Sequence, residues 1–545
     1  MQKSFDGIAL KELVEAGLTW LRTNHQIVNS LNVFPVPDGD TGTNMLLTMQ
    51  SAYSEVEHLG HHNAGQMAAA IAQGALMGAR GNSGVILSQL WRGIARALHG
   101  KDVIDGPALA AAFAEGRDTA YKGVVRPIEG TILTVAKDCA IAAEEALKNT
   151  ADPTEILRRV VHAADLSVQH TPELLPILKQ AGVVDSGGKG LFFIFEGMLR
   201  FLDGESLETP LISVQPISAM KLENAMQDVE EGQDFEVVVD FRPTSTFDLK
   251  KFYGDLEKMG TSIQVGEGEG MYRMHIHVPL DDRYVPIDYI MGLGTVIKIA
   301  MENLTAQMDE IESRAGETKL ELANIGPGQI AVVVVSPGLG LSRIFASLGV
   351  ASIVSGGQTM NPSTKDILDS FENLPTDKVI ILPNNKNIVL AAQQAKEVTA
   401  KNVHIVPSKT IPQGLAAMLH LDPDGELEKI VQKMTSALDD VLTGEITIAT
   451  RSVEIDGVKV EDGQVIALLN GKLAVSSDSV ENACLEFLKK AQAADYELIT
   501  LFYGEDLPHI EANRIADLIR ENYPEQEVEV QEGGQPHYQF IISIE

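Results

Sequence analysis

A change in the spacing of apolar residues near residue 204 limits the folds open to this chain of 545 residues. Up to about residue 202, apolar side chains such as Ile8, Leu10 and Leu13 recur near helical spacing, and alanine-rich segments follow with little β-branched alternation. Small residues let helices approach one another closely, as in a compact bundle. The sequence therefore predicts an all-α N-terminal domain over residues 1–203.

Beyond that domain the pattern predicts a linker and two further domains, as expected for a chain too long for one hydrophobic core. Proline and acidic residues mark residues 204–233 as the linker. An α+β middle domain is predicted over 234–318, with its first strand at Phe235–Phe241. Over 319–545, buried strands such as Val379–Leu382 alternate with helices, which predicts an α/β C-terminal domain with parallel strands and a mixed final segment.

The overall charge and the cysteine content narrow the class of protein. The formal net charge is −33 and is spread along the chain, which disfavours nucleic-acid partners and anionic membrane surfaces. Cys139 and Cys484 are the only cysteines, so they provide no disulfide framework and fit a reducing compartment. The N-terminus mixes charges among its apolar residues, and no apolar run is long enough to span a bilayer. We therefore expect a cytoplasmic protein without a transmembrane segment.

The most informative stretch, residues 32–45, reads NVFPVPDGDTGTNM. Asp38 and Asp40 flank Gly39, and a turn at this glycine aims both carboxylates at one point. Two hard oxygen ligands held close together suit Mg²⁺ on nucleotide phosphates, and a helix beginning nearby adds N–H groups and partial positive charge for anions. The residues that offer hydroxyl, amide and backbone donors next to the aspartates are Thr41, Gly42, Thr43 and Asn44. The alternative is that Asp-Gly-Asp is only a surface turn.

This stretch resembles the nucleotide-binding domain of the dihydroxyacetone kinase family, of the eight-helix L-subunit type. The resemblance implies an all-α barrel or bundle of eight helices, with two Mg²⁺ ions held between the protein and ATP. The positions that match the family's metal-binding pattern are Asn29, Leu31, Asn32, Asp38 and Asp40. Asn32 stands where the dihydroxyacetone kinases have an aspartate, and its neutral oxygen is a weaker ligand. The resemblance thus implies Asn32, Asp38 and Asp40 as the metal-binding and catalytic residues.

Three later segments extend this resemblance. Residues 78–88 read GARGNSGVILS, where the family opens a helix onto the phosphates, residues 129–134 read EGTILT, and residues 183–190 read VVDSGGKG and close the domain. The nucleotide-binding residues that the resemblance implies here are Asn82, Ser83, Gly84, Gly130, Thr131 and Asp185. A helix-capping role is an equal alternative for Asp185. Arg80 either neutralises phosphate charge or forms a surface salt bridge.

Three C-terminal motifs narrow the resemblance. Residues 355–363 read SGGQTMNPS, residues 382–387 read LPNNKN, and residues 406–414 read VPSKTIPQG. With the N-terminal motif, they are similar to the catalytic subunit of bacterial fatty acid kinase over nearly the whole chain. The resemblance implies a role in lipid metabolism, in which a DegV-type fatty-acid-binding protein presents the fatty acid and ATP phosphorylates it to an acyl phosphate. From the residues alone, the three motifs are polar loops at strand ends, serving either as turns or as a docking surface.

His275 and His277 form a candidate second metal site in the middle domain. They lie two residues apart on a predicted strand, so both imidazoles point to one face. Relatives often carry a cysteine on the neighbouring strand that completes a zinc-like site, whereas that strand offers Asp240 here. Zinc binding is one reading, and a structural or partner-contacting histidine pair is the other. We also expect a homodimer formed through the middle domain.

Two other functions compete with a fatty acid kinase. A dihydroxyacetone-type kinase binds its triose covalently through a histidine of a separate domain, and no comparable domain is found. The histidines without supporting context are His404, His420, His509 and His537. The other alternative is a non-enzymatic regulator that binds nucleotide. The presence of both Asp38 and Asp40 argues against it, because degenerate kinases tend to lack metal ligands.

Overall fold

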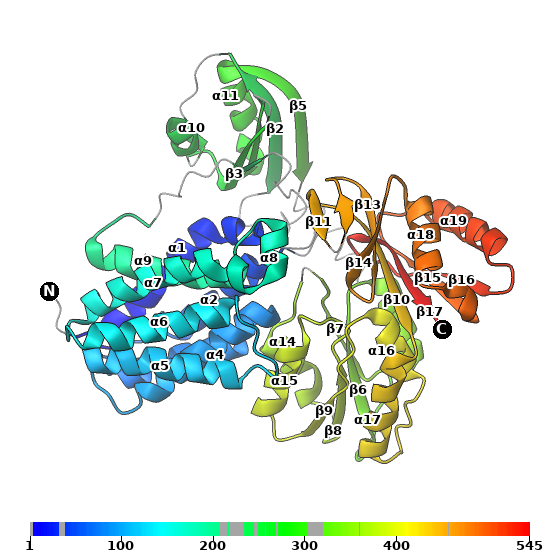
Figure 1. Ribbon diagram of the computed structural model, residues 1–545, viewed down its shortest axis with the longest axis horizontal. Coiled ribbons are helices and arrows are strands. Elements are labelled where there is room, and N and C mark those ends of the chain that lie inside the picture. Colours follow the sequence, from blue (N-terminus) through cyan, green and yellow to red (C-terminus); the bar gives the residue numbers. More distant parts are fainter. Residues whose placement is uncertain are drawn as a thin grey trace. The chain divides into compact units, whose positions relative to one another are not determined.

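The computed structural model describes residues 4–31, 39–207, 215–216, 234–244, 249–256, 258–268, 271–303, 320–358, 360–455 and 457–545. The chain forms two compact units, one made of Met1–Thr209 and Glu321–Glu545 and the other of Pro210–Leu320 (Figure 1). None of the described helices combines the length and the apolar character that crossing a lipid bilayer requires. The predicted domain boundaries and the predicted homodimer stay predictions.

Helices are the only regular elements in the described part of the N-terminal 203 residues, which also takes part in two isolated bridges, Phe5 with Ile104 and Arg80 with Ser363. They are α1 (Gly7–Asn29), α2 (Thr41–Ser54), α3 (Ala64–Met77), α4 (Gly81–Ala97), α5 (Gly106–Lys122), α6 (Ile132–Leu147), α7 (Pro153–Leu174), α8 (Pro176–Ala181) and α9 (Ser186–Asp203). The prediction of a helical N-terminal domain is confirmed. A closed barrel of eight helices stays a prediction.

Glycines bring these helices into close contact around one apolar core. A Cβ atom at Gly197 on α9 would lie 2.6 Å from the Cβ atom of Trp20 on α1. A Cβ atom at Gly93 on α4 would lie 2.3 Å from the carbonyl oxygen of Glu115 on α5. Both distances are shorter than any real side chain allows, so these two helix pairs depend on glycine for their spacing. Most buried apolar side chains of the domain belong to one cluster.

The described residues of the Pro210–Leu320 unit contain a five-stranded sheet in the order β1-β3-β4-β2-β5 and the helices α10 and α11. Its elements are β1 (Gln215–Pro216), β2 (Phe235–Pro243), α10 (Leu249–Leu256), β3 (Thr261–Gly268), β4 (Met271–Val278), α11 (Val285–Leu293) and β5 (Gly294–Asn303). Val237 and Val239 pack in one core with Phe252 of α10 and Ile290 of α11. Because side chains alternate along a strand, Glu236 of β2 points to the opposite face of the sheet.

The C-terminal residues contain two large sheets and the two-stranded sheet β11-β12, all in the same unit as the N-terminal helices. The first is a parallel four-stranded sheet in the order β7-β6-β8-β9, and the second is a six-stranded sheet in the order β14-β13-β10-β17-β15-β16. The elements of the first region are β6 (Ala331–Ser336), α13 (Leu339–Ser347), β7 (Ser352–Ser355), α14 (Thr364–Glu372), β8 (Lys378–Leu382), α15 (Val389–Val398), β9 (Asn402–Ile405), α16 (Ile411–Met418) and α17 (Leu427–Ser436). Those of the second region are β10 (Leu442–Ile448), β11 (Val453–Ile455), β12 (Val458–Val460), β13 (Val465–Leu469), β14 (Lys472–Ser477), α18 (Val480–Lys490), β15 (Leu498–Tyr503), α19 (His509–Asn522), β16 (Glu527–Glu532) and β17 (Tyr538–Ile544). The predicted α/β character of this region is confirmed.

Helices cover both faces of the parallel sheet. Val332 and Val334 share a core with α13, α16 and α17, whereas Val333 and Val335 share another with α14 and α15 (Figure 1). The second core also contains Ala79, which lies between α3 and α4. The C-terminal α/β region is therefore packed against the N-terminal helices through a common apolar cluster.

Candidate functional site

Asp40 stands at the start of α2, where the described chain resumes after residues 32–38. It occupies the N-cap position and is 8% exposed, yet its side chain does not cap the helix. Asn32 and Asp38 lie outside the described residues. Of the three predicted metal ligands, Asp40 is therefore the one whose surroundings the structure describes.

The first turn of α2 is capped by Asn29, the last residue of α1. The Asn29 side-chain oxygen accepts hydrogen bonds from the backbone N–H groups of Gly42 at 2.7 Å and Thr43 at 3.2 Å. Its amide nitrogen donates to the Thr43 hydroxyl at 3.0 Å. Because Asn29 satisfies these helix donors, the carboxylate of Asp40 is not used as a cap. The capping role of Asn29 was not predicted.

Four helices, α2, α4, α6 and α9, begin close to one another. The Ser186 hydroxyl of α9 donates to the Thr41 hydroxyl of α2 at 3.3 Å. A Cβ atom at Gly187 of α9 would lie 3.5 Å from the Ser83 hydroxyl oxygen of α4 and 3.3 Å from the Ile132 Cβ atom of α6. Helix N-termini carry partial positive charge, and no side chain caps the N-terminus of α4, so this meeting point favours an anion such as a phosphate.

The sequence prediction around residue 83 falls on the start of α4. Gly81 has φ +55°, a conformation that favours glycine, and its backbone lies against the buried side chain of Asn44. Asn82, Ser83 and Gly84 form the first turn of the helix. Ser83 lies at the meeting point described above, whereas the Asn82 amide donates to Asn387 at 3.2 Å. The structure thus places Asn44 against the start of α4 and Ser83 beside the start of α9, and it directs Asn82 towards the C-terminal region.

Gly130 and Thr131 form the turn that leads into α6. Gly130 is buried with φ +80°, and its N–H group donates to the Thr134 hydroxyl at 2.8 Å. Thr131 is the N-cap of α6, and its hydroxyl donates to the carbonyl oxygen of Ile128 at 2.7 Å. Both predicted residues are therefore next to the meeting point of the helices, where they shape the loop before α6.

Asp185 caps α9. Its carboxylate accepts a hydrogen bond from the backbone N–H of Gly188 at 2.6 Å. Burial raises the pKa of this carboxyl group to about 6, although the N–H groups of Gly188 and Ile132 lower it in part. The capping role that stood as an alternative for Asp185 is present. The same capping interaction keeps the start of α9 in place beside Thr41 of α2.

Arg80 forms an ion pair rather than an open positive site. Its guanidinium lies 3.3 Å from the carboxylate of Asp366 on α14 and donates to the carbonyl oxygen of Asn361 at 3.0 Å. Asn361 in turn donates its side-chain amide to the carboxylate of Asp40 at 2.5 Å. Asn361 belongs to the SGGQTMNPS motif, and no local signal in the sequence pointed to this contact across 321 positions.

The donor set at this place fits magnesium and nucleotide phosphates. Asp40 supplies a buried carboxylate, a hard oxygen ligand of the kind that Mg²⁺ prefers. The side-chain oxygen of Asn361, also buried, has no hydrogen-bond partner among the described residues. The converging helix starts supply partial positive charge for an anion. The predicted assignments to nucleotide and metal stay proposals.

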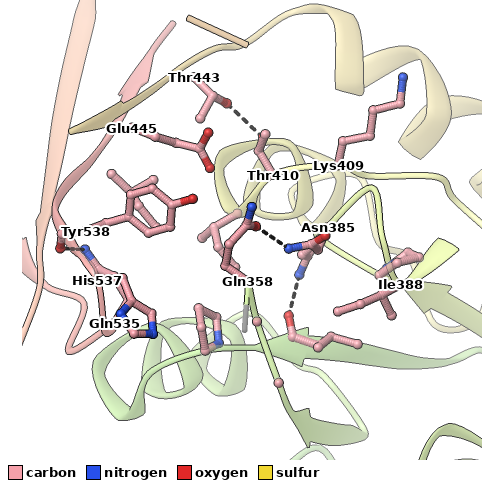
Figure 2. Close-up of a pocket in the computed structure, with 18 of the residues that line it drawn as sticks. Gln358, Asn385, Ile388, Lys409, Thr410, Thr443, Glu445, Gln535, His537 and Tyr538 are labelled. Carbon is pink, nitrogen blue, oxygen red and sulfur yellow. Dashed lines mark hydrogen bonds between the residues drawn. The ribbon is translucent and has the colours of Figure 1, made fainter. Parts of the chain in front are cut away.

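All three C-terminal motifs line one pocket at the carboxyl ends of the parallel strands. Figure 2 shows Gln358, Asn385 and Thr410, one from each motif, facing this space together with His537 and Tyr538 of the second sheet region. The Asn385 amide donates to Gln358 at 2.7 Å. Parallel sheets place ligand-binding groups at this edge, so the motifs are more than separate turns.

Two loops connect this pocket with the helical domain. The loop after β7 carries Gln358 in the pocket and Asn361 against Asp40. The loop after β8 carries Asn385 in the pocket and Asn387 against Asn82. The C-terminal motifs therefore contact the helical domain as well as the pocket, a role that was not predicted for them.

In the middle unit, His275 and His277 do share one face of β4, and both are buried. The third group is Glu236, whose ligand atom lies within 4.8 Å of one on each histidine. Glu236 is 3.0 Å from the Nε2 atom of His275. The expected carboxylate, Asp240, is not part of this cluster, because the strand register places it opposite Arg273, which it binds at 2.6 and 2.8 Å. Two imidazoles and a carboxylate are a donor set that zinc accepts, and zinc binding stays a prediction.

The family of the chain follows from its similarity to known sequences. Residues 331–545 match the model of the FakA-like C-terminal domain of fatty acid kinase, residues 232–311 match the FakA-like middle domain of the same kinase, and residues 35–200 match the DAK2 domain. The chain is 40% identical over 553 residues to protein YloV of Bacillus subtilis (strain 168), and 100% of each chain is covered.

The chain belongs to the FakA-like fatty acid kinase family. An uncharacterized protein of Staphylococcus aureus (strain USA300) is 38% identical to it over 555 residues, with 100% of each chain covered. The fatty acid kinase and DAK2 matches make it a member of a kinase family. The resemblance drawn from its motifs is confirmed.

Solved structures resemble separate parts of this FakA-like chain. The dihydroxyacetone kinase of C. freundii in complex with AMP-PNP and Mg²⁺ is 22% identical, covers 37% of this chain and 35% of its own, and gives a TM-score of 0.29. The DegV family protein Cg2579 of Corynebacterium glutamicum is 14% identical, covers 40% of this chain and 97% of its own, and gives a TM-score of 0.31. TM-scores this low carry no argument about the present chain.

Proposed function

We propose that this chain is an ATP-dependent kinase that transfers the γ-phosphoryl group of ATP to the carboxylate of a fatty acid held by a separate DegV-type protein. The observation that carries the proposal is the meeting of four helix N-termini beside the buried carboxylate of Asp40. Membership of the FakA-like fatty acid kinase family supports the choice of acceptor. A triose kinase or a regulator without catalytic activity is favoured by no feature of the described residues.

Several residues at this place would hold the triphosphate. The starts of α2, α4, α6 and α9 offer partial positive charge to an anion, and the first N–H groups of α4 have no side-chain cap. The hydroxyl of Thr43 is held by Asn29, and the hydroxyl of Ser83 lies beside the start of α9. Groups that are already positioned stabilise the charge that spreads over the phosphoryl oxygens without having to reorganise.

Asp40 would hold magnesium together with Asn32 and Asp38. Magnesium, when bound with ATP, offsets the repulsion between the triphosphate and the incoming carboxylate. One carboxylate oxygen attacks the γ-phosphorus, the bond from this phosphorus to the β,γ-bridging oxygen breaks, and ADP leaves with that oxygen. The acceptor is already ionised at neutral pH, so no side chain has to remove a proton from it. The products are an acyl phosphate and ADP.

A hydroxylamine assay tests this reaction directly. Purified protein is mixed with ATP, Mg²⁺ and a fatty acid, with or without a DegV-type protein from the same genome, and acyl phosphate is trapped as a hydroxamate. We expect product only when all components are present. The Asp40→Ala variant should lose at least about 100-fold in rate, because one preorganised charge-stabilising group contributes on this order.

The Asp369→Ala variant is the matched control, since Asp369 is an exposed carboxylate on α14 that pairs with Lys365 alone among the described residues. Its rate should equal that of the unmodified protein. Turnover that survives Asp40→Ala would remove Asp40 from the proposed site. If no fatty acid supports turnover with or without the carrier while ATP still binds, the regulator becomes the better account.

A further inference from the structure

The side chain of Asn361 is buried between the C-terminal region and the helical domain. It is 2% exposed, and its amide nitrogen donates to the Asp40 carboxylate at 2.5 Å. Its backbone carbonyl oxygen accepts a hydrogen bond from Arg80 at 3.0 Å. Asn361 thus reaches from the C-terminal region to a predicted magnesium ligand of the helical domain.

The orientation of this amide is fixed by chemistry. A carboxylate only accepts hydrogen bonds, so the group of Asn361 that faces Asp40 is its nitrogen and not its oxygen. The oxygen, on the same planar group, remains within a few ångströms of the carboxylate. No described residue donates a hydrogen bond to it. A buried acceptor without a partner costs free energy unless a ligand satisfies it.

The backbone around Asn361 is held firmly. Ser363 caps α14 in a capping box with Asp366, and it pairs with Arg80 in an isolated β-bridge. The Arg80 guanidinium lies 3.3 Å from the Asp366 carboxylate. The start of α14 and the residue before α4 are therefore tied together directly after Asn361. Such support suits a side chain that positions a metal ligand.

We infer that Asn361 completes the magnesium–nucleotide site from the C-terminal region. Its amide nitrogen keeps the Asp40 carboxylate in one orientation, and its oxygen accepts a hydrogen bond from the water shell that Mg²⁺ retains when it binds a nucleotide. This inference rests on the proposed function of Asp40. It makes the C-terminal α/β region part of the kinase site, so the helical domain is incomplete without that region.

Calorimetric titration with ATP at a series of Mg²⁺ concentrations tests the inference without turnover. For Asn361→Ala, we expect the Mg²⁺ concentration needed for half-maximal ATP binding to rise about 10- to 100-fold, the usual effect of losing a group that supports a metal ligand. ATP binding in EDTA should change little. Asn361→Ser keeps a small polar side chain and serves as the second variant where the alanine variant does not fold.

Gln394→Ala is the matched control. Gln394 is a buried amide at the same junction that bonds Ser88 and Thr364, and no described contact joins it to Asp40. It should leave the Mg²⁺ dependence unchanged even where it lowers stability. An Mg²⁺ dependence that is the same in the Asn361 variants and the unmodified protein overturns the inference alone. Unmodified protein whose ATP binding does not depend on Mg²⁺ overturns the proposed function instead.

Discussion

Gln394 of α15 forms two hydrogen bonds with Ser88 of α4, although 306 positions separate them in the sequence. The Gln394 amide nitrogen donates to the Ser88 hydroxyl at 3.1 Å, and the Ser88 hydroxyl lies 3.4 Å from the Gln394 side-chain oxygen. Thr364 of α14 donates to the same oxygen at 3.3 Å. All three side chains are buried, so this polar group lies inside the junction between the helices and the C-terminal sheet.

Removing this amide should destabilise the unit. Gln394→Ala leaves the hydroxyls of Ser88 and Thr364 without their shared partner in a buried place, which costs about 1–3 kcal/mol. We expect a lower midpoint of urea-induced unfolding. Glu397→Gln is the control, because Glu397 forms an exposed ion pair with Arg92 on the same pair of helices, and such pairs contribute little. Equal midpoints for the two variants would show that the amide is not important for the junction.

The cap that Asn29 provides to α2 should matter for stability and for nucleotide binding. Asn29→Ala removes the acceptor for the N–H groups of Gly42 and Thr43, and losing a cap costs about 1 kcal/mol. It also frees the Thr43 hydroxyl, so ATP should bind more weakly. Calorimetry and thermal unfolding measure the two effects. Asn29→Asp keeps an acceptor for both N–H groups and should lose less stability than Asn29→Ala; the reverse order would contradict the capping role.

Local patterns in the sequence predicted the elements well. The strand predicted at Val379–Leu382 is β8, Lys378–Leu382, and the strand predicted at Phe235–Phe241 is β2, Phe235–Pro243. Each segment is a short run rich in β-branched or aromatic residues, so the residues adjacent in the sequence are enough to determine that it forms a strand. The helical character of the first domain was visible for the same reason.

Contacts between distant elements could not be predicted. Asp240 was expected beside the histidines because it lies on the neighbouring strand, but the register of β2 and β4 places Glu236 opposite His277. Glu236 and Asp240 lie four positions apart on one face of β2, so the register of the strand pair decides which carboxylate faces the histidines, and no local pattern determines this register. The contact between Asn361 and Asp40 has the same origin, since it arises only when two regions pack together.

The raised pKa of Asp185 predicts a dependence of stability on pH. Burial raises this pKa from 3.8 to about 6. The folded chain therefore binds more protons than the unfolded chain between these two values, so the contribution of Asp185 to the free energy of unfolding falls as pH rises from about 4 to 6. The difference in pKa limits the effect to about 3 kcal/mol.

Asp185→Asn tests this dependence, because asparagine keeps an oxygen that can accept from Gly188 but does not titrate. Urea unfolding at pH 4.5 and 7, without nucleotide, gives the free energy for both proteins. We expect the asparagine variant to gain stability relative to the unmodified protein as pH rises, by roughly 1–3 kcal/mol. If the free energy of unfolding depends on pH in the same way in both proteins, the pKa of the Asp185 carboxyl group is not raised by folding.

The reactivity of the two cysteine thiols should show whether the helical domain or the C-terminal region opens in solution. Cys139 lies on α6 among the helices and Cys484 lies on α18 beside the six-stranded sheet, and both are buried. Burial raises the pKa of both thiols, so little thiolate is present at neutral pH. In single-thiol chains made by Cys139→Ser or Cys484→Ser, we expect neither remaining thiol to react with a disulfide reagent until urea unfolds the protein. As a control, Lys148→Cys is made in a chain that lacks both Cys139 and Cys484. It provides an exposed thiol at the end of α6, which should react at once. Rapid native labelling of Cys139 would mean that the helical core opens readily in solution.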